Sequence, residues 1–488
     1  MSSDLLRVID EMPRPKILVV GDLILDRYIS GTVERVSPEA PIQVLRQRGA
    51  DHNVGGTAAV ASNLARLGAH VSLVGVIGTD GPGKELKSLL EEKGLDLSGV
   101  VAESGRPTTL KTRFVAASQH ARQQILRVDH ETDGPLRAKT LGKLDDAVAK
   151  ALSDVDVCVL SDYAKGVLRT DFCARLIGAA RDAGVPVLVD PKGGDFSKYR
   201  AATAITPNRT EAAYASGTTI ESYEDAAAAA GTLVKELELD CIYITLDRDG
   251  IFVRERGTPG AAVRTDPREV YDVTGAGDNV MSVLAYALGG GTSPLTAAAL
   301  ANIAGGIAVE HFGVVTVGWD EIAARVAAGG EGEAKLVRLS ILQHLLESAR
   351  SAGRKVVFTN GCFDLIHPGH VDLLRRARAL GDLLVVGMND DASIKRLKGP
   401  DRPVNELGAR ASVLGGLASV DYITSFSEDT PEELIRAIKP DVLVKGDDWA
   451  EKGVVGSEFV ESRGGKVVLL PLVEGHSTTS ILRKLEDD

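Results

Sequence analysis

The chain has 488 residues, which predicts two or three domains rather than a single hydrophobic core. Its 25% charged and 44% hydrophobic residues are typical of a soluble globular protein. The formal net charge of −12 argues against nucleic-acid binding, because that affinity depends on Lys and Arg side chains that neutralise phosphates. No apolar run reaches the length of about eighteen residues that a membrane span needs, and the N-terminal stretch has acids where a signal peptide has bases. We therefore expect a cytoplasmic protein that binds small molecules, with neither nucleic acid nor a membrane as partner.

The cysteines indicate neither a disulfide framework nor a zinc site. Cys158, Cys173, Cys241 and Cys362 form no CxxC pair. We expect them to be buried thiols in a reducing compartment.

The first apolar run, Lys16–Val20, predicts a buried strand that ends at Gly21-Asp22. Ligands in open α/β sheets bind at the carboxyl ends of strands. Asp22 and Asp26 are therefore candidates for binding sugar hydroxyls, with Asp22 the better placed of the two. The alternative interpretation makes both of them solvated loop acids.

Glycines mark two further segments of the first half. Gly55-Gly56 precedes an Ala-rich helix, and paired glycines there permit close approach of the backbone to a substrate. The segment Gly78–Lys84 (GTDGPGK) imitates a P-loop, but Glu85 stands where Mg²⁺ coordination needs Ser or Thr. We reject it as a phosphate-binding loop.

The stretch Thr108–Asp129 alternates short β-like runs with cations that include Lys111, Arg113 and Arg127. A small β flap with these cations would suit a phosphorylated sugar. A merely polar hairpin face is an equally good interpretation.

From Val155 onward, apolar runs alternate with helical patterns, and each run ends in polar residues such as Asp162, Asp190 and Lys192. This pattern predicts a mostly parallel sheet with functional groups along one edge. The segment Ile205–Glu211 (ITPNRTE) follows one of these runs.

The stretch Val270–Gly289 (VYDVTGAGDNVMSVLAYALG) combines a glycine turn with an apolar run of helical spacing. The unpaired N–H groups and dipole of a helix start attract a phosphate. Asp278 stands beside this anion site, where a carboxylate is a poor choice for binding alone but a sensible base for removing a proton from an attacking hydroxyl. In isolation, a glycine turn before a core helix would be the commoner interpretation.

Residues 328–338 are rich in Gly and Glu, so we predict a linker there and a second α/β pattern from 339 to 488. Its first strand runs into Thr359–His370 (TNGCFDLIHPGH), which places His367 and His370 at the start of a helix. Such imidazoles can donate hydrogen bonds to phosphate oxygens during displacement at phosphorus. A zinc site would need further ligands, and the spacing provides none. Downstream candidates for phosphate binding are Lys398, Arg402, Arg410, the strand-end sequence Lys445–Trp449 and the hydroxyls of Ser477–Ser480.

With these residues in view, residues 1–327 resemble the ribokinase-like (PfkB) sugar kinases, through DVTGAGD, Gly55-Gly56 and the NxxE of Asn208–Glu211. Residues 339–488 resemble the cytidylyltransferase-like nucleotidyltransferases, through HPGH and STTSIL. The fusion order, together with ERVSPEAP, SDYAKG and RPVN, is similar to the bifunctional heptose-phosphate kinase and adenylyltransferase family of Gram-negative bacteria. The fold class implied is a ribokinase-like α/β domain with a small β flap, followed by a Rossmann-like α/β nucleotidyltransferase domain.

The resemblance implies two reactions. The first half would phosphorylate D-glycero-β-D-manno-heptose 7-phosphate at its anomeric hydroxyl with ATP. The second half would transfer an adenylyl group from ATP to the heptose 1-phosphate, which gives ADP-heptose, a precursor of the lipopolysaccharide core, and pyrophosphate. Mg²⁺ is the implied cofactor, and a homodimer is the family expectation.

The resemblance also implies roles for residues. The catalytic residues would be Asp278, His367 and His370. ATP in the kinase would be bound by Asn208, Arg209, Thr210, Glu211, Thr245, Gly275, Ala276 and Gly277, with Glu211 holding Mg²⁺ through water. The sugar would be bound by Asp22, Gly55, Gly56, Asn63, Lys111, Arg127 and Lys192. The transferase nucleotide would be bound by Thr359, Asn360, Gly361, Phe363, Asp364, Lys398, Arg402, Lys445, Gly446, Ser477, Thr478 and Thr479.

Three places depart from the family pattern: Ala59 replaces a common Asn, Asp247 follows ITL where Gly is usual, and the family's KGGD is here Lys445-Gly446-Asp447-Asp448. Two rival hypotheses remain. One is another sugar or polyol kinase fused to a cytidylyltransferase. The other is a sugar-phosphate sensor with a decayed site, against which the retention of Asp278 and Glu211 argues, because binding alone requires no base.

Overall fold

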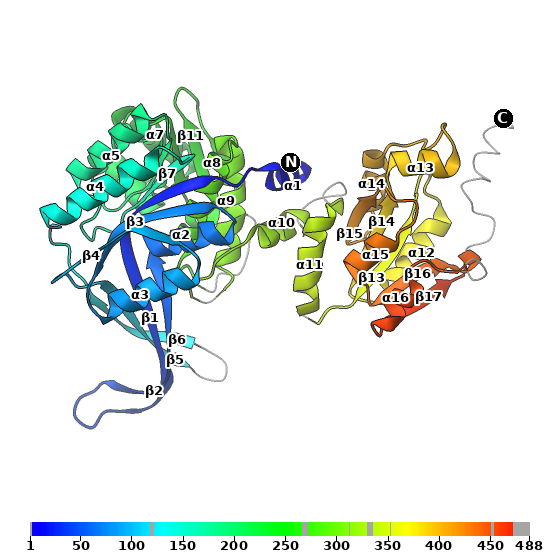
Figure 1. The fold of residues 1–488 in the computed structure, drawn as a ribbon, viewed down its shortest axis with the longest axis horizontal. Helices are drawn as coiled ribbons and strands as arrows, with labels where there is room; N and C mark the ends of the chain where they lie inside the picture. The colour runs from blue at the N-terminus through cyan, green and yellow to red at the C-terminus, as the bar shows by residue number, and fades with distance from the viewer. Residues whose placement is uncertain are drawn as a thin grey trace. The chain divides into compact units, whose positions relative to one another are not determined.

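The computed structural model describes residues 2–117, 122–265, 272–311, 313–328, 335–351, 353–449 and 453–471. The chain forms two compact units: a larger unit, Met12–Gly318, and a smaller unit of Met1–Glu11 with Trp319–Asp488 (Figure 1). Helices α1 (Ser2–Glu11) and α10 (Trp319–Ala328) pack against each other within the smaller unit. The sequence-based boundary after residue 327 stays a prediction, and most of the predicted linker lies outside the described residues. Within the described ranges, no helix combines the length and apolar character that crossing a bilayer requires.

The larger unit is built on one mixed sheet whose main path has the order β12-β11-β10-β9-β8-β7-β1-β3-β4. Strand β1 pairs in parallel with β3 on one side and β7 on the other, and the parallel pairing continues through β8, β9 and β10. The strand bounds are β1 Lys16–Val36, β2 Gln43–Gly56, β3 His70–Gly78, β4 Asp96–Glu103, β5 Thr109–Ala117, β6 Arg122–His130, β7 Val157–Ser161, β8 Val187–Asp190, β9 Ala204–Ile205, β10 Cys241–Thr245, β11 Ile251–Glu255 and β12 Ala261–Val263.

Strand β1 belongs to both the central sheet and a flap. Its first residues, Lys16–Asp22, pair with β3, whereas Leu23–Val36 pairs with β2, and β5 and β6 extend this second layer. Figure 1 shows the flap strands projecting from the body of the larger unit. The structure thus has the predicted α/β domain with a small β flap.

Helices cover both faces of the central sheet, as a buried parallel sheet requires. Leu18 and Val20 face a core formed with α4, α5 and α7, while the opposite face carries α2, α8 and α9. The helix bounds are α2 Thr57–Arg66, α3 Gly81–Glu92, α4 Ala138–Leu152, α5 Thr170–Asp182, α6 Arg209–Ser216, α7 Tyr223–Glu236, α8 Ala276–Gly289 and α9 Pro294–Ala308.

The start of α3, within the P-loop-like GTDGPGK, is filled by the protein's own carboxylate. Asp80 is the N-cap residue and accepts a hydrogen bond from the Gly83 N–H at 3.0 Å. It also accepts from the Thr108 N–H at 2.9 Å and the Thr108 hydroxyl at 2.6 Å. An anionic side chain already occupies the place of a phosphate, which agrees with the rejection of this segment as a phosphate loop.

The smaller unit has a parallel sheet in the order β15-β14-β13-β16-β17, the arrangement of a doubly wound fold. The chain winds outward from β13 in both directions, so the topological switch point lies between β13 and β16. The bounds are α11 Leu339–Ser351, β13 Val356–Gly361, α12 Pro368–Arg378, β14 Leu383–Asn389, α13 Asp391–Lys398, α14 Leu407–Gly415, β15 Tyr422–Phe426, α15 Glu432–Ile438, β16 Val442–Gly446, α16 Ser457–Ser462 and β17 Lys466–Leu470. This confirms the prediction of a Rossmann-like second domain.

Candidate active sites

A cavity of about 280 Å³ opens in the larger unit where the carboxyl ends of the central strands meet the flap. Much of the predicted kinase site lines it. The predicted residues on its wall are Gly56, Lys111, Lys192, Asn208, Glu211, Thr245, Gly275, Gly277 and Asp278. Asp22, Gly55, Asn63, Arg127, Arg209, Thr210 and Ala276 are not among the lining residues.

The predicted anion-binding turn is the N-terminus of α8. Gly275 is the N-cap residue and has a φ of 78°, a left-handed conformation that glycine adopts without strain. Asp272 supports the turn by accepting hydrogen bonds from the Thr274 N–H (2.9 Å) and the Gly313 N–H (2.9 Å). Asn279 donates to the carbonyls of Gly275 (2.9 Å) and Val315 (2.8 Å), which fixes the first turn of the helix.

Asp278 lies in this first turn and faces the cavity. Burial raises the pKa of its carboxyl group to about 6, and a hydrogen bond from Tyr163 opposes part of that rise. The Tyr163 hydroxyl donates to Asp278 Oδ1 at 2.5 Å. A carboxylate whose pKa lies near the working pH can accept a proton and release it again, as a general base must.

Other carboxylates share the cavity. Asp190, at the end of β8, has a pKa raised well above its usual value by burial and by the nearby Asp278 and Glu211. Lys192 supplies positive charge, because its ammonium group lies 3.1 Å from Glu211 Oε1. Burial and the neighbouring carboxylates therefore favour the protonated form of Asp190.

Asn208 and Glu211 form a capping box at the start of α6. Asn208 Oδ1 accepts from the Glu211 N–H at 2.9 Å, and Glu211 Oε2 accepts from the Asn208 N–H at 3.1 Å. Both residues line the cavity, but each oxygen of Glu211 already has a protein partner.

Arg209 was predicted to bind ATP, but in the structure its side chain contacts the turn after β10. Its guanidinium group pairs with Asp247 at 3.2 Å and Asp249 at 2.6 Å, and it donates to the Leu246 carbonyl at 2.8 Å. Asp247 has a φ of 54°, so it adopts the left-handed conformation at the position where the family usually has Gly. Arg209 therefore holds the turn after β10, and the acid of that turn is neutralised by it.

The two candidate acids at the end of the first strand differ in their position relative to the cavity. Asp26 lines the cavity, whereas Asp22 does not. Asp22 is 2% exposed, and its carboxylate accepts hydrogen bonds from the N–H groups of Tyr163 (3.1 Å), Lys165 (3.0 Å) and Val167 (3.2 Å). Asp22 therefore holds the loop after β7, because the oxygens expected to bind sugar hydroxyls are engaged by the backbone.

Asp26 forms a buried ion pair with Arg113. A Cβ on Gly55 would come within 2.3 Å of the Asp26 carboxylate, so glycine at this position makes room for the pair. Of the predicted flap cations, Lys111 reaches the cavity and lies 5.5 Å from the centroid of the Tyr163 ring. Arg127 pairs with Asp129 on β6 instead.

A second cavity, of about 550 Å³, lies in the smaller unit at the switch point of its sheet. The ends of β13 and β16 and the start of α12 form its wall, as expected for a ligand site in an open α/β sheet. The predicted residues that line it are Thr359, Asn360, Gly361, Phe363, Asp364, His367, His370, Lys398, Lys445 and Gly446. Ser477, Thr478 and Thr479 lie outside the described residues.

The two histidines stack at the start of α12. Their ring centroids are 3.8 Å apart with an interplanar angle of 25°, and His370 also contacts the Phe363 ring at 5.2 Å. Burial, together with the nearby His367 and Lys398, lowers the pKa of His370 to about 4. His370 is therefore a neutral imidazole at pH 7, with one N–H to donate.

Lys445 brings a cation to the same cavity from the end of β16. Its ammonium group donates to the Asn360 carbonyl at 3.1 Å and lies 4.9 Å from the Trp449 ring centroid. Burial lowers the pKa of Lys445 to about 8, although Asp448 acts in the opposite direction. A buried, incompletely solvated ammonium favours the arrival of an anion.

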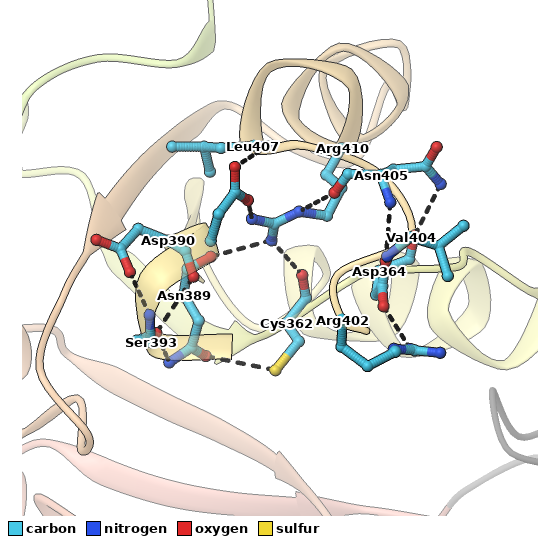
Figure 2. Close-up of polar contacts among 11 residues, drawn as sticks. Cys362, Asp364, Asn389, Asp390, Ser393, Arg402, Val404, Asn405, Leu407 and Arg410 are labelled. Carbon is cyan, nitrogen blue, oxygen red and sulfur yellow. Dashed lines mark hydrogen bonds and ion pairs between the residues drawn. The ribbon is translucent and has the colours of Figure 1, made fainter. Parts of the chain in front are cut away.

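The loop that carries the histidines is held by a polar network (Figure 2). Asp364 is 3% exposed, accepts from the N–H groups of Val404 (2.8 Å) and Asn405 (3.2 Å), and forms an ion pair with Arg402. Both residues were predicted to bind nucleotide, which stays a prediction: the two side chains bind each other, Asp364 lines the cavity, and Arg402 is not among the lining residues.

Arg410 is the centre of the network shown in Figure 2. Its fully buried guanidinium group donates to the carbonyls of Cys362 (2.6 Å), Asn389 (3.0 Å) and Asn405 (2.9 Å), and it pairs with Asp391 at 2.7 Å. It therefore joins the loops after β13 and β14 to α14. Arg410 was a candidate phosphate ligand in the sequence, and the structure makes it a support of the site.

Sequence reasoning did not identify several residues of the two sites. Tyr163, Asp272 and Asn279 act through partners that are distant in the chain, as the contacts above show. The signal that could have indicated Tyr163 is its place directly after the acid that ends the strand β7, within SDYAKG.

Comparisons with known proteins define the class of each unit. A family model described as pfkB family carbohydrate kinase matches residues 14–321, and a cytidylyltransferase-like model matches residues 358–481. Solved structures share the fold of the first match. A ribokinase from Arabidopsis thaliana complexed with ribose and ATP has a TM-score of 0.52 and 20% identity, over 64% of this chain and 99% of that chain. Phosphofructokinase-2 from Escherichia coli in complex with substrates and products has a TM-score of 0.53 and 18% identity, over 64% of this chain and 99% of that chain. The chain thus joins a carbohydrate kinase to a nucleotidyltransferase.

Relatives that match both units at once narrow the class. The bifunctional protein HldE of Citrifermentans bemidjiense is 47% identical over 469 residues, which is 96% of each chain. The protein of the same name from Wolinella succinogenes is 44% identical over 475 residues, covering 97% of this chain and 98% of that one. The chain belongs to the bifunctional HldE family, and it is both a phosphotransferase and a nucleotidyltransferase.

Proposed function

We propose that the larger unit transfers the γ-phosphoryl group of ATP to the anomeric hydroxyl of D-glycero-β-D-manno-heptose 7-phosphate. After a separate phosphatase has removed the 7-phosphate, the smaller unit transfers an adenylyl group from ATP to the heptose 1-phosphate, and ADP-heptose and pyrophosphate are formed. Full-length similarity to HldE proteins supports this pair of reactions. The observation that carries the kinase half is a buried carboxylate, Asp278, in the first turn of a helix whose N-terminus faces the cavity.

In the kinase reaction, Asp278 removes the proton of the anomeric hydroxyl while that oxygen attacks the γ-phosphorus of ATP. The N–H groups at the start of α8, around Gly275 and Gly277, stabilise the charge that develops on the transferred group. Lys111 and the Asp26–Arg113 pair face the sugar from the flap. We place this ATP-dependent reaction in the cytoplasm.

The donor set suits Mg²⁺. Among the described residues, no group of three or more His, Cys, Asp or Glu side chains could cage a metal. The cavity does contain carboxylates, and Mg²⁺ usually takes one or two carboxylates and substrate phosphates while it keeps several waters. Glu211 would hold the ion through water, because its own oxygens already accept hydrogen bonds. When bound, Mg²⁺ neutralises charge on the ATP phosphates.

In the transferase reaction, the sugar 1-phosphate attacks the α-phosphorus of ATP directly. The neutral His370 and its stacked neighbour His367 donate hydrogen bonds to the phosphate oxygens as charge develops on them. Lys445 binds the polyphosphate from the end of β16. This acceptor is already an anion, so the step needs no base.

One experiment separates this proposal from a fusion with another specificity. Purified full-length protein would be given ATP or CTP with heptose 1-phosphate or a polyol phosphate, and pyrophosphate release would be measured. We expect release only with ATP and the heptose 1-phosphate. Release with CTP and a polyol phosphate would instead establish the alternative kinase–cytidylyltransferase assignment, and no release with any pair would indicate a sensor.

A homodimer formed through the flap completes the proposal. Leu126 and Val128 lie two residues apart on β6, so they point to one face of the strand, and they are 55% and 49% exposed. Exposed apolar side chains gathered on a flap are typical of a surface that meets a partner. Sedimentation equilibrium should give a dimer for the wild type and a monomer for Leu126→Asp. The control Leu295→Asp, at an exposed leucine of α9, should remain dimeric.

A further inference from the structure

The loop after β7 is built around Asp22. This carboxylate accepts hydrogen bonds from the backbone N–H groups of three alternate residues, Tyr163, Lys165 and Val167, at 3.0–3.2 Å. Between them, Ala164 adopts a left-handed φ of 56°, and its N–H donates to Asp162 at 2.7 Å. A non-glycine residue persists in that conformation only where surrounding contacts impose it. The chain thus specifies the path of this loop with a buried acid whose own side chain does not reach the cavity.

The result of this arrangement is the position of one side chain. Tyr163 lines the cavity, and its hydroxyl donates to Asp278 Oδ1 at 2.5 Å. Lys111 lies above the tyrosine ring, 5.5 Å from its centroid. Burial, and then the Asp278 carboxylate, raise the pKa of Tyr163 well above its usual value, so the phenol keeps its proton and acts as a donor throughout the physiological range.

We propose that Tyr163 is a positioning residue for phosphoryl transfer: its hydroxyl fixes Oδ1 of Asp278 and directs Oδ2 toward the acceptor hydroxyl. The inference rests on the proposed kinase function. In the step itself, the acceptor O–H bond breaks and its proton passes to Oδ2. The acceptor oxygen forms a bond to the γ-phosphorus, and the bond from that phosphorus to the ADP oxygen breaks. Tyr163 loses no proton and touches no reacting atom.

A second consequence concerns the charge of the base. The groups that face Asp278 are Tyr163 from the β7 loop, Asp26 from β1, Lys111 from β5 and Asp190 from β8. Burial favours the protonated form of Asp278, and so does the charge of Asp26. Tyr163 and Lys111 act against them, and Tyr163 is the one that donates a direct hydrogen bond. Without the hydroxyl of Tyr163, Asp278 would remain protonated to a higher pH.

The test compares kcat/KM for heptose 7-phosphate at saturating MgATP between pH 5 and pH 9, with the full-length protein. Hydrogen bonds to charged groups correspond to about one pKa unit or more. We expect Tyr163→Phe to move the acid limb upward by about one pH unit and to lower kcat/KM roughly fivefold at pH 6 and almost tenfold at pH 5, with the deficit narrowing above pH 8. Superimposable profiles, or a loss equal at every pH, would overturn the inference.

The matched control is Tyr199→Phe. Tyr199 is buried and donates to Asp162 at 2.6 Å, so it loses the same kind of hydrogen bond without touching Asp278. The acid limb of the Tyr199→Phe profile should coincide with that of the wild type. A shift as large as that of Tyr163→Phe would overturn the inference. In an Asp278→Asn background, Tyr163→Phe should change the residual rate less than twofold, because the group through which it acts is gone. Wild type without activity on heptose 7-phosphate would instead refute the proposed function.

Discussion

Replacing the proposed base should make the larger unit more stable while it abolishes phosphoryl transfer. Burial raises the pKa of Asp278 from 3.8 to about 6. The difference of about two units corresponds to about 3 kcal/mol, by which the folded protein disfavours the ionised form relative to the unfolded chain. Asparagine has the same shape without the charge, and its Oδ1 can still accept the hydrogen bond from Tyr163. Asp278→Asn should therefore add about 2–3 kcal/mol to the free energy of unfolding at pH 7.5.

The sign of the pH dependence follows from the direction of the shift. Because the folded-state pKa exceeds the unfolded-state value, the folded protein binds more protons between pH 3.8 and about 6. The wild type therefore loses stability as the pH rises through that window, whereas the variant does not. The advantage of Asp278→Asn should be complete above pH 6 and fall below about 1 kcal/mol at pH 4.

Calorimetric unfolding of the larger unit at pH 7.5, 6, 5 and 4 measures this effect. A gain of 2–3 kcal/mol corresponds to roughly 5 °C for a unit of this size. The kinase rate should fall about a hundredfold or more, while pyrophosphate release by the smaller unit stays unchanged. Asp182→Asn, at an exposed acid that ends α5, is the matched control and should alter stability by no more than about 0.5 kcal/mol. Equal unfolding temperatures for Asp278→Asn and wild type at pH 7.5 would show that the carboxylate carries no burial penalty and would refute the reasoning.

Three further outcomes are expected. Arg410→Met should lower the stability of the smaller unit by about 3 kcal/mol and abolish nucleotidyl transfer, because Asp391 and the carbonyls of the loops lose their donor. Chemical denaturation measures the stability, and pyrophosphate release measures the transfer. Kinase activity should be unchanged and is the control. Between pH 8 and pH 5.5 the kinase rate should fall about fourfold as Asp278 takes up its proton, whereas nucleotidyl transfer should not fall and should rise by no more than about twofold, because the pKa of His370 is about 4 and that of Lys445 is about 8. Arg113→Met should cost about 3–5 kcal/mol in denaturant unfolding by leaving Asp26 buried and unpaired, and a second substitution, Asp26→Leu, should recover part of that loss.

The sequence was sufficient for features that local pattern determines. Buried strands with polar ends, a glycine turn before an apolar helix and two histidines at a helix start lie where the pattern indicates. Gly275 illustrates why: only a residue that tolerates positive φ can start α8 in this way, and that demand is visible in one position of the chain.

The sequence was insufficient wherever a side chain's partner is distant. Asp22 and Asp26 are neighbouring acids, and the choice between them depends on which one meets the loop at residues 163–167, more than 140 positions away. Arg402 was a candidate for phosphate binding, and Arg209 was a predicted ATP ligand through the family resemblance, yet each is bound by acids of its own unit. Tyr163 stands within SDYAKG, but its contact with Asp278 depends on the left-handed turn at Ala164 and on a partner 115 residues away in the chain.

The two cavities treat charge in opposite ways, and the proposed reactions require this. A neutral hydroxyl must lose a proton before it can become a good nucleophile, so the kinase cavity holds a carboxylate whose pKa is raised toward neutrality by burial. A phosphate acceptor already carries negative charge, and a base beside it would only repel it. In the smaller unit, the acid nearest the histidines in the chain, Asp364, is accordingly neutralised by Arg402 and two backbone N–H groups, and the cavity presents a neutral His370 and a buried Lys445. Both proposed displacements at phosphorus thus take place at the N-terminus of a helix. The charge of the nucleophile determines which side chains stand beside that N-terminus.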